Sequence, residues 1–192
     1  MQLQEFAETV HRTAKEKGWW KQYENGDVMP RPPLEVKMLI VSELAEATEE
    51  VRNGKPEVYW MVPTGMIKWD DTGRGANLRS GDKLCKPEGE AVELIDAVIR
   101  IMDWFVANKW NLNEHMDDNY HLPVRESALE THMDLVTMVA KATGDDEEKM
   151  LGRVVKVIKE YFDLKDWDFK TVLKMKMEYN ETRPFRHGGK TA

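Results

Sequence analysis

The chain has 192 residues, of which 41% are hydrophobic and 33% are charged, and its formal net charge is −7. This length and composition suit one helix-rich domain, whereas the negative charge argues against general binding to nucleic acid or to an anionic membrane. No apolar run approaches the roughly 18 residues of a membrane span, and no signal-peptide pattern opens the chain, so we expect a cytoplasmic protein. Cys85 is the only cysteine, which excludes an intramolecular disulfide.

The first part of the chain is predicted to hold two helices. Residues 2–17 carry apolar side chains at helical spacing, and Gly18 ends this helix. Pro32 and Pro33 mark the start of a second helix, which runs to about Asn53, where an Asn-Gly pair ends it.

A long connection, residues 54–85, follows the second helix. Two short runs within it, VYWMV and MIKW, could pair as a small β-hairpin, and their Trp60 and Trp69 are candidates for a lid over a site. The segment 73–83 contains glycines and arginines but lacks a P-loop motif, so we expect a mobile loop that could contact a nucleotide.

The second half is predicted to be helical. A strong helix covers about 87–109, helical patterns recur at 125–143, 146–162 and 168–180, and a basic tail covers 181–192. We see no convincing internal repeat, and the strand content is small. The predicted fold class is therefore all-α, a single helical-bundle domain over residues 1–192.

Four glutamates lie close together in the second helix. At about 100° per residue, Glu43, Glu46 and Glu50 share an arc of about 60° with apolar residues, whereas Glu49 points towards a more polar side. A carboxylate among apolar groups costs free energy unless it is paired or binds a metal ion. The alternative is an ordinary charged helix edge whose side chains reach water.

A second acidic set lies in the helix predicted at 87–109. Glu93, Asp96, Arg100 and Asp103 form a narrow polar stripe on a helix whose other positions are almost all apolar. The alternative is a stripe that faces solvent. If the two helices face each other, four carboxylates converge, and their repulsion demands cations such as Mg²⁺ or Mn²⁺. Such a site suits metal-assisted hydrolysis of phosphate or pyrophosphate bonds.

Three sequence blocks occur in a characteristic order. They are ExxE at 43–46, ExxD at 93–96, and the closing KMEYNETRPFRHGGK at 176–190, with GWW at 18–20 ahead of them. In this order the blocks resemble the phage and bacterial branch of the MazG-like all-α nucleoside triphosphate pyrophosphohydrolases. Two departures are a long gap between the first two blocks and residues 111–165, which look like an inserted helical pair.

The resemblance implies an activity and an assembly. A nucleoside triphosphate, in particular a deoxynucleoside triphosphate, would be hydrolysed between its α and β phosphates to a monophosphate and pyrophosphate. It also implies dependence on Mg²⁺, for which Mn²⁺ can substitute, and a homodimer or homotetramer whose bundle is completed across subunits. The protein would control deoxynucleotide pools, in the host cytoplasm if it is phage-encoded.

The resemblance also assigns roles to the acids. Glu43, Glu46, Glu93 and Asp96 match the family's metal ligands. Glu46 and Glu50 are candidates for the general base, between which the sequence does not choose. Glu90 is expected outside the site.

Donors for phosphate oxygens are expected near the C-terminus. Lys176, Asn180 and Arg183 recur at i, i+4 and i+7, which would present an ammonium, an amide and a guanidinium on one face. His187 and Lys190 are further phosphate-contact candidates in the tail. The alternative is a solvated basic terminus favoured by the helix dipole.

Other functions remain open at this point. A dUTP or dCTP diphosphatase, or a phosphoribosyl-ATP pyrophosphohydrolase, would use the same metal chemistry. A purine deoxynucleotide such as dGTP is a guess at the substrate. A non-catalytic helical scaffold or regulatory module with solvated acids is the alternative from another class.

Overall fold

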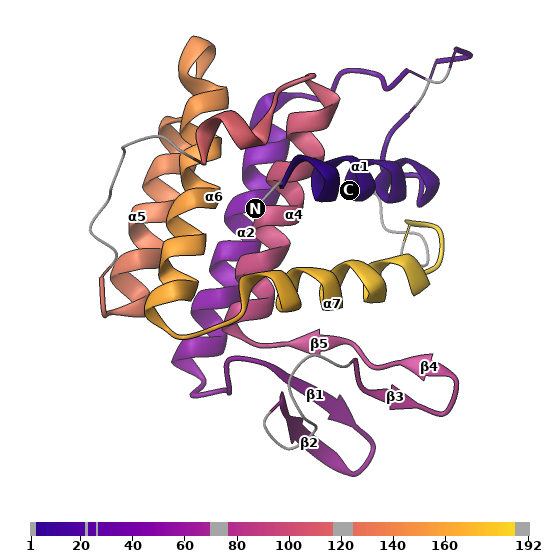
Figure 1. Cartoon of the computed structure of the whole chain (residues 1–192), viewed down its shortest axis with the longest axis vertical. Helices are drawn as coiled ribbons and strands as arrows, with labels where there is room; N and C mark the ends of the chain where they lie inside the picture. The colour runs from indigo at the N-terminus through magenta and orange to yellow at the C-terminus, as the bar shows by residue number, and fades with distance from the viewer. Residues whose placement is uncertain (1–2, 22, 26, 70–76, 117–124, 187–192) are drawn as a thin grey trace.

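The computed structural model describes residues 3–21, 23–25, 27–69, 77–116 and 125–186 (Figure 1). These residues are mostly helical, which confirms the predicted helix-rich character. The α-helices described are α1 (Gln4–Glu16), α2 (Pro33–Arg52), α4 (Glu90–Ala107), α5 (Ala128–Lys141), α6 (Glu147–Leu164) and α7 (Phe169–Thr182). Within these ranges, no helix is both long and apolar enough to cross a membrane.

The connection between α2 and α4 is more ordered than the sequence suggests. β1 (Tyr59–Val62) and β2 (Gly65–Lys68) form the expected hairpin, and β5 (Pro87–Glu88) pairs with the other edge of β1. β3 (Arg79–Ser80) and β4 (Lys83–Leu84) form a second, two-stranded ribbon. The hairpin considered within residues 54–85 is therefore present, and the third strand β5 and the ribbon β3–β4 are additions that the sequence did not indicate.

The two tryptophans of this region lie in the core. Trp60 is 0% exposed and Trp69 is 7% exposed, so neither side chain is available as the surface lid that we expected. In the segment 73–83, the residues before Asn77 lie outside the described part of the chain. Asn77 itself donates hydrogen bonds to the Met175 carbonyl and to Glu178 on α7.

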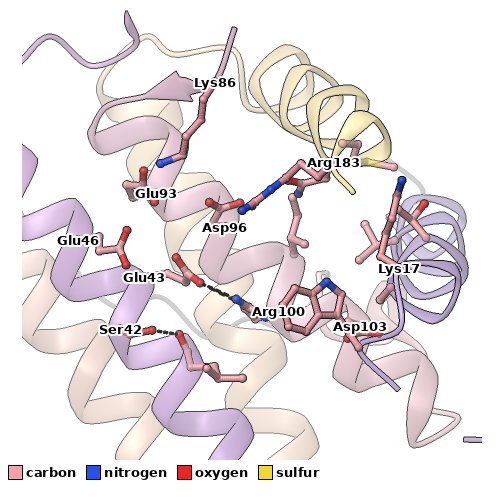
Figure 2. A pocket seen from close by; sticks show the side chains of 18 residues that line it. Lys17, Ser42, Glu43, Glu46, Lys86, Glu93, Asp96, Arg100, Asp103 and Arg183 are labelled. Carbon is pink, nitrogen blue, oxygen red and sulfur yellow. Dashed lines mark hydrogen bonds and ion pairs between the residues drawn. The ribbon is translucent and has the colours of Figure 1, made fainter. Parts of the chain in front are cut away.

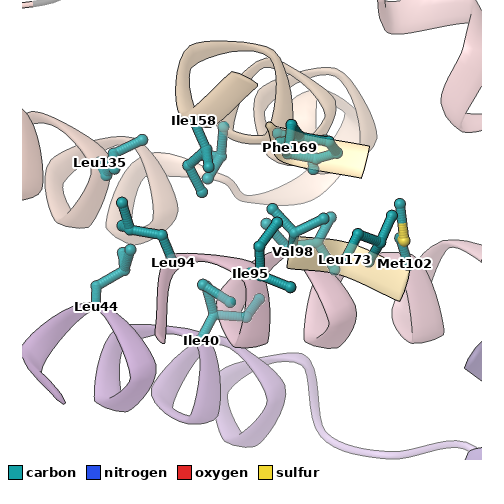
Figure 3. Close-up of a cluster of buried hydrophobic side chains, with 14 of the residues drawn as sticks. Ile40, Leu44, Leu94, Ile95, Val98, Met102, Leu135, Ile158, Phe169 and Leu173 are labelled. Carbon is teal, nitrogen blue, oxygen red and sulfur yellow. The ribbon is translucent and has the colours of Figure 1, made fainter. Parts of the chain in front are cut away.

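Four helices pack against α4. Helix α4 contacts α1, α2, α6 and α7, and α2 and α6 both contact α5. In Figure 1 the pair α5–α6 lies along one side of α2 and α4, and α1 and α7 both run across the direction of α2 and α4 on the other side. Figure 3 shows side chains of α2, α4, α5, α6 and α7 meeting in one core, including Ile40, Leu94, Leu135, Ile158 and Leu173. The predicted inserted pair is thus part of the main core.

The start of α4 is fixed by a close approach to the strand region. Gly89 has φ +114°, and a Cβ at this position would clash with the backbone oxygen of Glu57. The next turn is anchored by a hydrogen bond of 3.1 Å from the Ala91 amide to the same oxygen. Glycine permits this backbone because it lacks a Cβ. The constraint sets where Glu93, one turn further on, enters the interior.

Candidate metal centre

A cavity of about 310 Å³ opens between α1, α2, α4 and α7 (Figure 2). Its wall is mixed: apolar groups come from α1, α4 and α7, acidic groups come from α2 and α4, and basic groups surround the acids. The ionisable residues on this wall are Lys17, Glu43, Glu46, Lys86, Glu93, Asp96, Arg100, Asp103 and Arg183. The polar stripe predicted on α4 therefore faces a cavity.

Three carboxylates converge on this wall. Glu43 from α2 and Glu93 and Asp96 from α4 each offer an oxygen, and these oxygens lie within 4.8 Å of one another. Glu43 is 8% exposed and Glu93 is 2% exposed, so the cluster is sheltered from water. Carboxylate oxygens are the ligands that Mg²⁺ and Mn²⁺ prefer. These three residues could hold such an ion, as predicted for each of them.

Burial and mutual repulsion oppose ionisation of the cluster. Burial, then the charge of Asp96, raises the pKa of Glu93 to about 8, against the opposing effect of Lys176 and Lys86. The pKa of Glu43 is also raised, first by burial and then by Asp96, with Arg100 opposing the shift. A divalent cation would relieve both effects, because it replaces lost hydration and neutralises the repulsion.

Glu46 and Glu50 have different positions although both were predicted to act in catalysis. Glu46 lies on the cavity wall and is exposed, outside the group of three converging oxygens. Its charge still raises the pKa of both Glu43 and Glu93, which places it near them. Glu50 does not line the cavity, and it accepts a hydrogen bond of 3.0 Å from the Tyr59 hydroxyl. Its predicted role as a base is therefore not supported by its position.

Lys176 forms an ion pair with Asp96 and does not line the cavity. Its ammonium nitrogen is 2.7 Å from Asp96 Oδ2, and the side chain is 1% exposed. A buried cation at this distance holds the carboxylate in place and offsets its charge. The predicted direct contact between Lys176 and substrate phosphates is corrected to a positioning role beneath the acid cluster.

The other predicted donors are divided. Asn180 and Arg183 both line the cavity, and Figure 2 shows the Arg183 side chain beside Asp96. Burial is the main cause that lowers the pKa of Arg183 from its usual value, and the acid cluster opposes that shift. The Asn180 Oδ1 atom is buried without a hydrogen-bond partner among the described residues. His187 and Lys190 lie outside the described residues.

Several cavity residues were not assigned by sequence reasoning. Arg100 donates from Nε to Glu43 Oε1 at 3.1 Å, and Lys86 reaches the wall from the residue before β5 while it donates to Glu88. Lys17 lines the opposite side. The sequence signal of these three residues is weak, because lone basic residues are common on any surface.

Two acids of α4 have partners that the sequence did not identify. Asp103 accepts hydrogen bonds from Trp20 Nε1 at 2.9 Å and lies 2.7 Å from His11 Nδ1, whereas Arg100 pairs with Glu43. Glu90 lies outside the cavity, as expected, and contacts Tyr161 and His132.

A scan against protein-family models, a search of curated proteins and a search of solved structures each found no match to this chain.

Proposed function

We propose that the protein is a Mg²⁺-dependent nucleoside triphosphate pyrophosphohydrolase that resembles the MazG-like family. It would cleave a (d)NTP to the (d)NMP and pyrophosphate by attack of water on a phosphate. The observation that carries this proposal is the composition of one cavity wall. Three sheltered carboxylates at metal-binding spacing lie beside Lys86, Arg100 and Arg183. A triphosphate and its metal ion need such a combination of acids and cations.

Each side chain has a defined part in this proposal. Glu43, Glu93 and Asp96 hold the metal ion, with Glu46 as a further ligand or as the base that accepts a proton from water. Bound Mg²⁺ would neutralise phosphate charge and acidify a water molecule. Arg183 and Lys86 bind phosphate oxygens, and the unpaired Asn180 Oδ1 accepts a hydrogen bond from a sugar or base.

Burial argues against a purely structural acid cluster. In a scaffold, a glutamate that is 2% exposed and whose pKa is raised to about 8 would be a net cost without a ligand. The salt bridges of the cluster join Arg100 to Glu43 and Lys176 to Asp96, so Glu93 itself is helped only by the nearby charges of Lys176 and Lys86. Perturbed acids that converge in a cavity are more typical of functional sites. The alternatives of dUTP or dCTP diphosphatase and phosphoribosyl-ATP pyrophosphohydrolase use the same metal chemistry and differ in the base or sugar bound.

A substrate panel tests the proposal. The protein is incubated with each dNTP and NTP and with phosphoribosyl-ATP, in the presence of Mg²⁺ or of chelator, and pyrophosphate and orthophosphate are measured separately. We expect pyrophosphate from at least one deoxynucleotide, and only in the presence of metal. The first substrate to test is dGTP. Orthophosphate without pyrophosphate would exclude cleavage between the α and β phosphates.

Matched variants connect the activity to the cluster. Glu46→Gln and Asp96→Asn are expected to lower turnover at least 100-fold, because each loses a carboxylate that serves the metal or the water. Glu49→Gln is the control, since Glu49 is exposed on the same helix and pairs with Arg52. The enzyme proposal fails if no nucleotide is turned over and metal binding is unchanged in both variants, an outcome that would favour the scaffold.

A further inference from the structure

Two stretches of the chain that lie far apart share one sequence pattern, which becomes recognisable as an internal repeat only when the structure aligns their helices. Residues 34–48 read LEVKMLIVSELAEAT, and residues 129–143 read LETHMDLVTMVAKAT. The first stretch lies in α2, and the second covers α5 and its end. Leucine, glutamate, methionine, valine, both alanines and threonine recur at the same places. Within each stretch the shared leucine, methionine and valine follow i, i+4, i+7 spacing.

The two helices also expose and bury the same positions. Met38 and Met133 are 64% and 65% exposed, although methionine is normally a buried residue. Two positions further on, Ile40 and Leu135 are each 0% exposed. The correspondence therefore extends from the residue types to the direction in which the helices face.

A second pair of helices repeats in the same order. Residues 90–112 read EAVELIDAVIRIMDWFVANKWNL, and residues 147–169 read EEKMLGRVVKVIKEYFDLKDWDF. These stretches begin with α4 and α6 respectively. Aligned from their first glutamates, the pairs Leu94 and Leu151, Val98 and Val155, and Ile101 and Ile158 are all 0% exposed.

Both helices end in the same unusual backbone. Lys109 has φ 62° and Asp166 has φ 56°, and these two residues occupy equivalent places. Positive φ is uncommon for residues other than glycine. The residue after each donates its amide hydrogen, at 2.9 Å, to the carbonyl of the equivalent phenylalanine, in the bonds Trp110 to Phe105 and Trp167 to Phe162. Burial of a core does not by itself require this conformation, so its recurrence is an independent likeness.

The aromatic rings at these ends are arranged alike. Trp110 meets Phe105 edge-on with centroids 5.4 Å apart, and Trp167 meets Phe162 edge-on at 5.3 Å. Trp110 also meets Trp104 at 90°, and Trp167 meets the equivalent Tyr161 at 88°. An aromatic cluster of the same arrangement therefore lies at the C-terminal end of each helix.

The two helices exchange reciprocal hydrogen bonds. Tyr161 near the end of α6 donates to Glu90 at the start of α4, at 2.9 Å. Trp104 near the end of α4 donates to Glu147 at the start of α6, also at 2.9 Å. Glu90 is equivalent to Glu147, and Trp104 to Tyr161, so each contact is the image of the other. Contacts of this kind are the mark of a two-fold axis.

The outer helices follow the same two-fold relation. Lys37 of α2 donates to the Ala142 carbonyl at the end of α5, at 2.8 Å. Its equivalent on α5, His132, lies 3.0 Å from Thr48 near the end of α2, one residue beyond the place that perfect symmetry would give. The pairs α2–α4 and α5–α6 therefore pack as two copies of one helical hairpin.

The second copy lacks every acid of the metal centre. The places of Glu43 and Glu46 are taken by Met138 and Lys141, and those of Glu93 and Asp96 by Met150 and Arg153. Two thioethers and two cations cannot replace hard oxygen ligands for Mg²⁺. The core positions are preserved and the ligand positions are not.

We propose that α5–α6 is a diverged copy of the α2–α4 hairpin that occupies the place of a partner subunit and has lost its metal site. One chain then forms a complete pseudo-two-fold, four-helix bundle with one metal-binding half and one half that only packs. Any further copy of the chain would add to the outside of this bundle and would not complete it. The inference rests on the metal-binding part of the proposed function and does not depend on hydrolysis.

Restoring the lost acids tests this proposal in the full chain. The native cluster is first disabled with Glu43→Gln, Glu93→Gln and Asp96→Asn, which is expected to abolish Mn²⁺ binding measured by titration with electron paramagnetic resonance. Adding Met138→Glu, Met150→Glu and Arg153→Asp should restore binding, because the repeat places these side chains together as it places their equivalents. In the otherwise native chain the same three changes should double the bound Mn²⁺.

The control has the same net change in charge as this first graft. Thr137→Glu, Ala140→Glu and Lys149→Glu alter exposed positions that each precede an equivalent acid position by one, and should restore nothing. A second graft keeps the buried Met138 and uses Lys141→Glu, Met150→Glu and Arg153→Asp, in case the first does not fold. The proposal is overturned if a graft that melts cooperatively binds no Mn²⁺ while the native chain does, or if the control binds equally.

Double-mutant cycles test the two-fold relation without metal. One cycle combines Glu90→Gln with Tyr161→Phe, and the other combines Glu147→Gln with Trp104→Phe. We expect coupling of the same sign and similar size, because the two bonds are images of each other. Coupling in one cycle only would contradict the relation. If the native chain bound no Mn²⁺, the metal proposal would fail and these cycles would still decide the duplication.

Discussion

At the scale of single residues, the site is decided by which charges are buried together. Glu93 and Lys176 are almost fully buried. Asp96 lies near Glu93 and forms an ion pair with Lys176. The cluster combines three acids with partly compensating cations. Its stability and its metal affinity should therefore respond to changes in either sign of charge.

Removing the buried ammonium should destabilise the protein. Lys176→Met leaves Asp96 without its cation inside the acid cluster, and loss of one partner of a buried ion pair costs about 3–5 kcal/mol. Urea unfolding at neutral pH, without divalent metal, measures this change. Lys174→Met, at an exposed position of the same helix, should change the free energy of unfolding by less than about 0.5 kcal/mol. Equal effects of the two changes would contradict the assigned role.

The raised pKa of Glu93 predicts how stability depends on pH. In the folded state this carboxyl has a pKa of about 8, against an ordinary value of 4.5, so the folded protein holds its proton more tightly than the unfolded chain does. The free energy of unfolding should then fall as pH rises from about 4.5 to 8 in chelator. Glu93→Gln should flatten this fall, and Glu49→Gln should not.

At the scale of elements, the start of α4 connects the strand region to the acid cluster. Periodicity places a helix here and predicts its polar stripe, and the structure confirms the helix over Glu90–Ala107. Helical periodicity could not predict the contact between the Glu57 backbone and Gly89, because Glu57 lies before the first strand of the connection and Gly89 lies after the last one. The direction of the stripe is a property of this contact and of the helices packed around it.

Substituting this glycine should disturb both stability and metal binding. Gly89→Ala combines an unfavourable φ with a clash against the Glu57 carbonyl, so we expect a loss of more than about 2 kcal/mol and weaker Mn²⁺ binding. Gly54→Ala is the control, because it has positive φ and open space around the added Cβ. Calorimetry and metal titration of both variants distinguish the clash from the cost of φ alone.

At the scale of the whole molecule, four helices from two halves share one core. Leu94, Leu135, Ile158 and Leu44 come from different helices of this group and are each 0% exposed. A domain with a single core of this kind is expected to unfold as one cooperative unit. The segment predicted as an insertion should then be as stable as the helices that carry the acids.

A void created in the α5–α6 hairpin should therefore also lower the stability of the α2–α4 hairpin. Leu151→Ala removes a fully buried side chain from α6, which is expected to cost about 2–5 kcal/mol. Amide hydrogen exchange should show lower protection in α2 and α4 as well as in α5 and α6. Loss of protection restricted to α5 and α6 would indicate two independent units.

The sequence alone determined the local features of this protein. Spacing of apolar residues predicted the helices, and two short runs indicated that a β1–β2 hairpin was possible. The acid pairs predicted Glu43, Glu46, Glu93 and Asp96 as a group, of which the structure brings Glu43, Glu93 and Asp96 together. These features depend on neighbours along the chain, which is why they can be read from it.

Only the tertiary structure decided which of the predicted residues meet. It brought Lys86 and Arg100 to the acids, placed Lys176 beneath Asp96 and left Glu50 with Tyr59. It also made the relation between the two hairpins visible. The sequence separation between α2 and α5 differs from that between α4 and α6, because strands lie between α2 and α4 whereas only a short turn joins α5 to α6. The match is therefore recognised from contacts that the two-fold axis relates. Convergence depends on how helices cross, and no spacing along a single helix specifies that crossing.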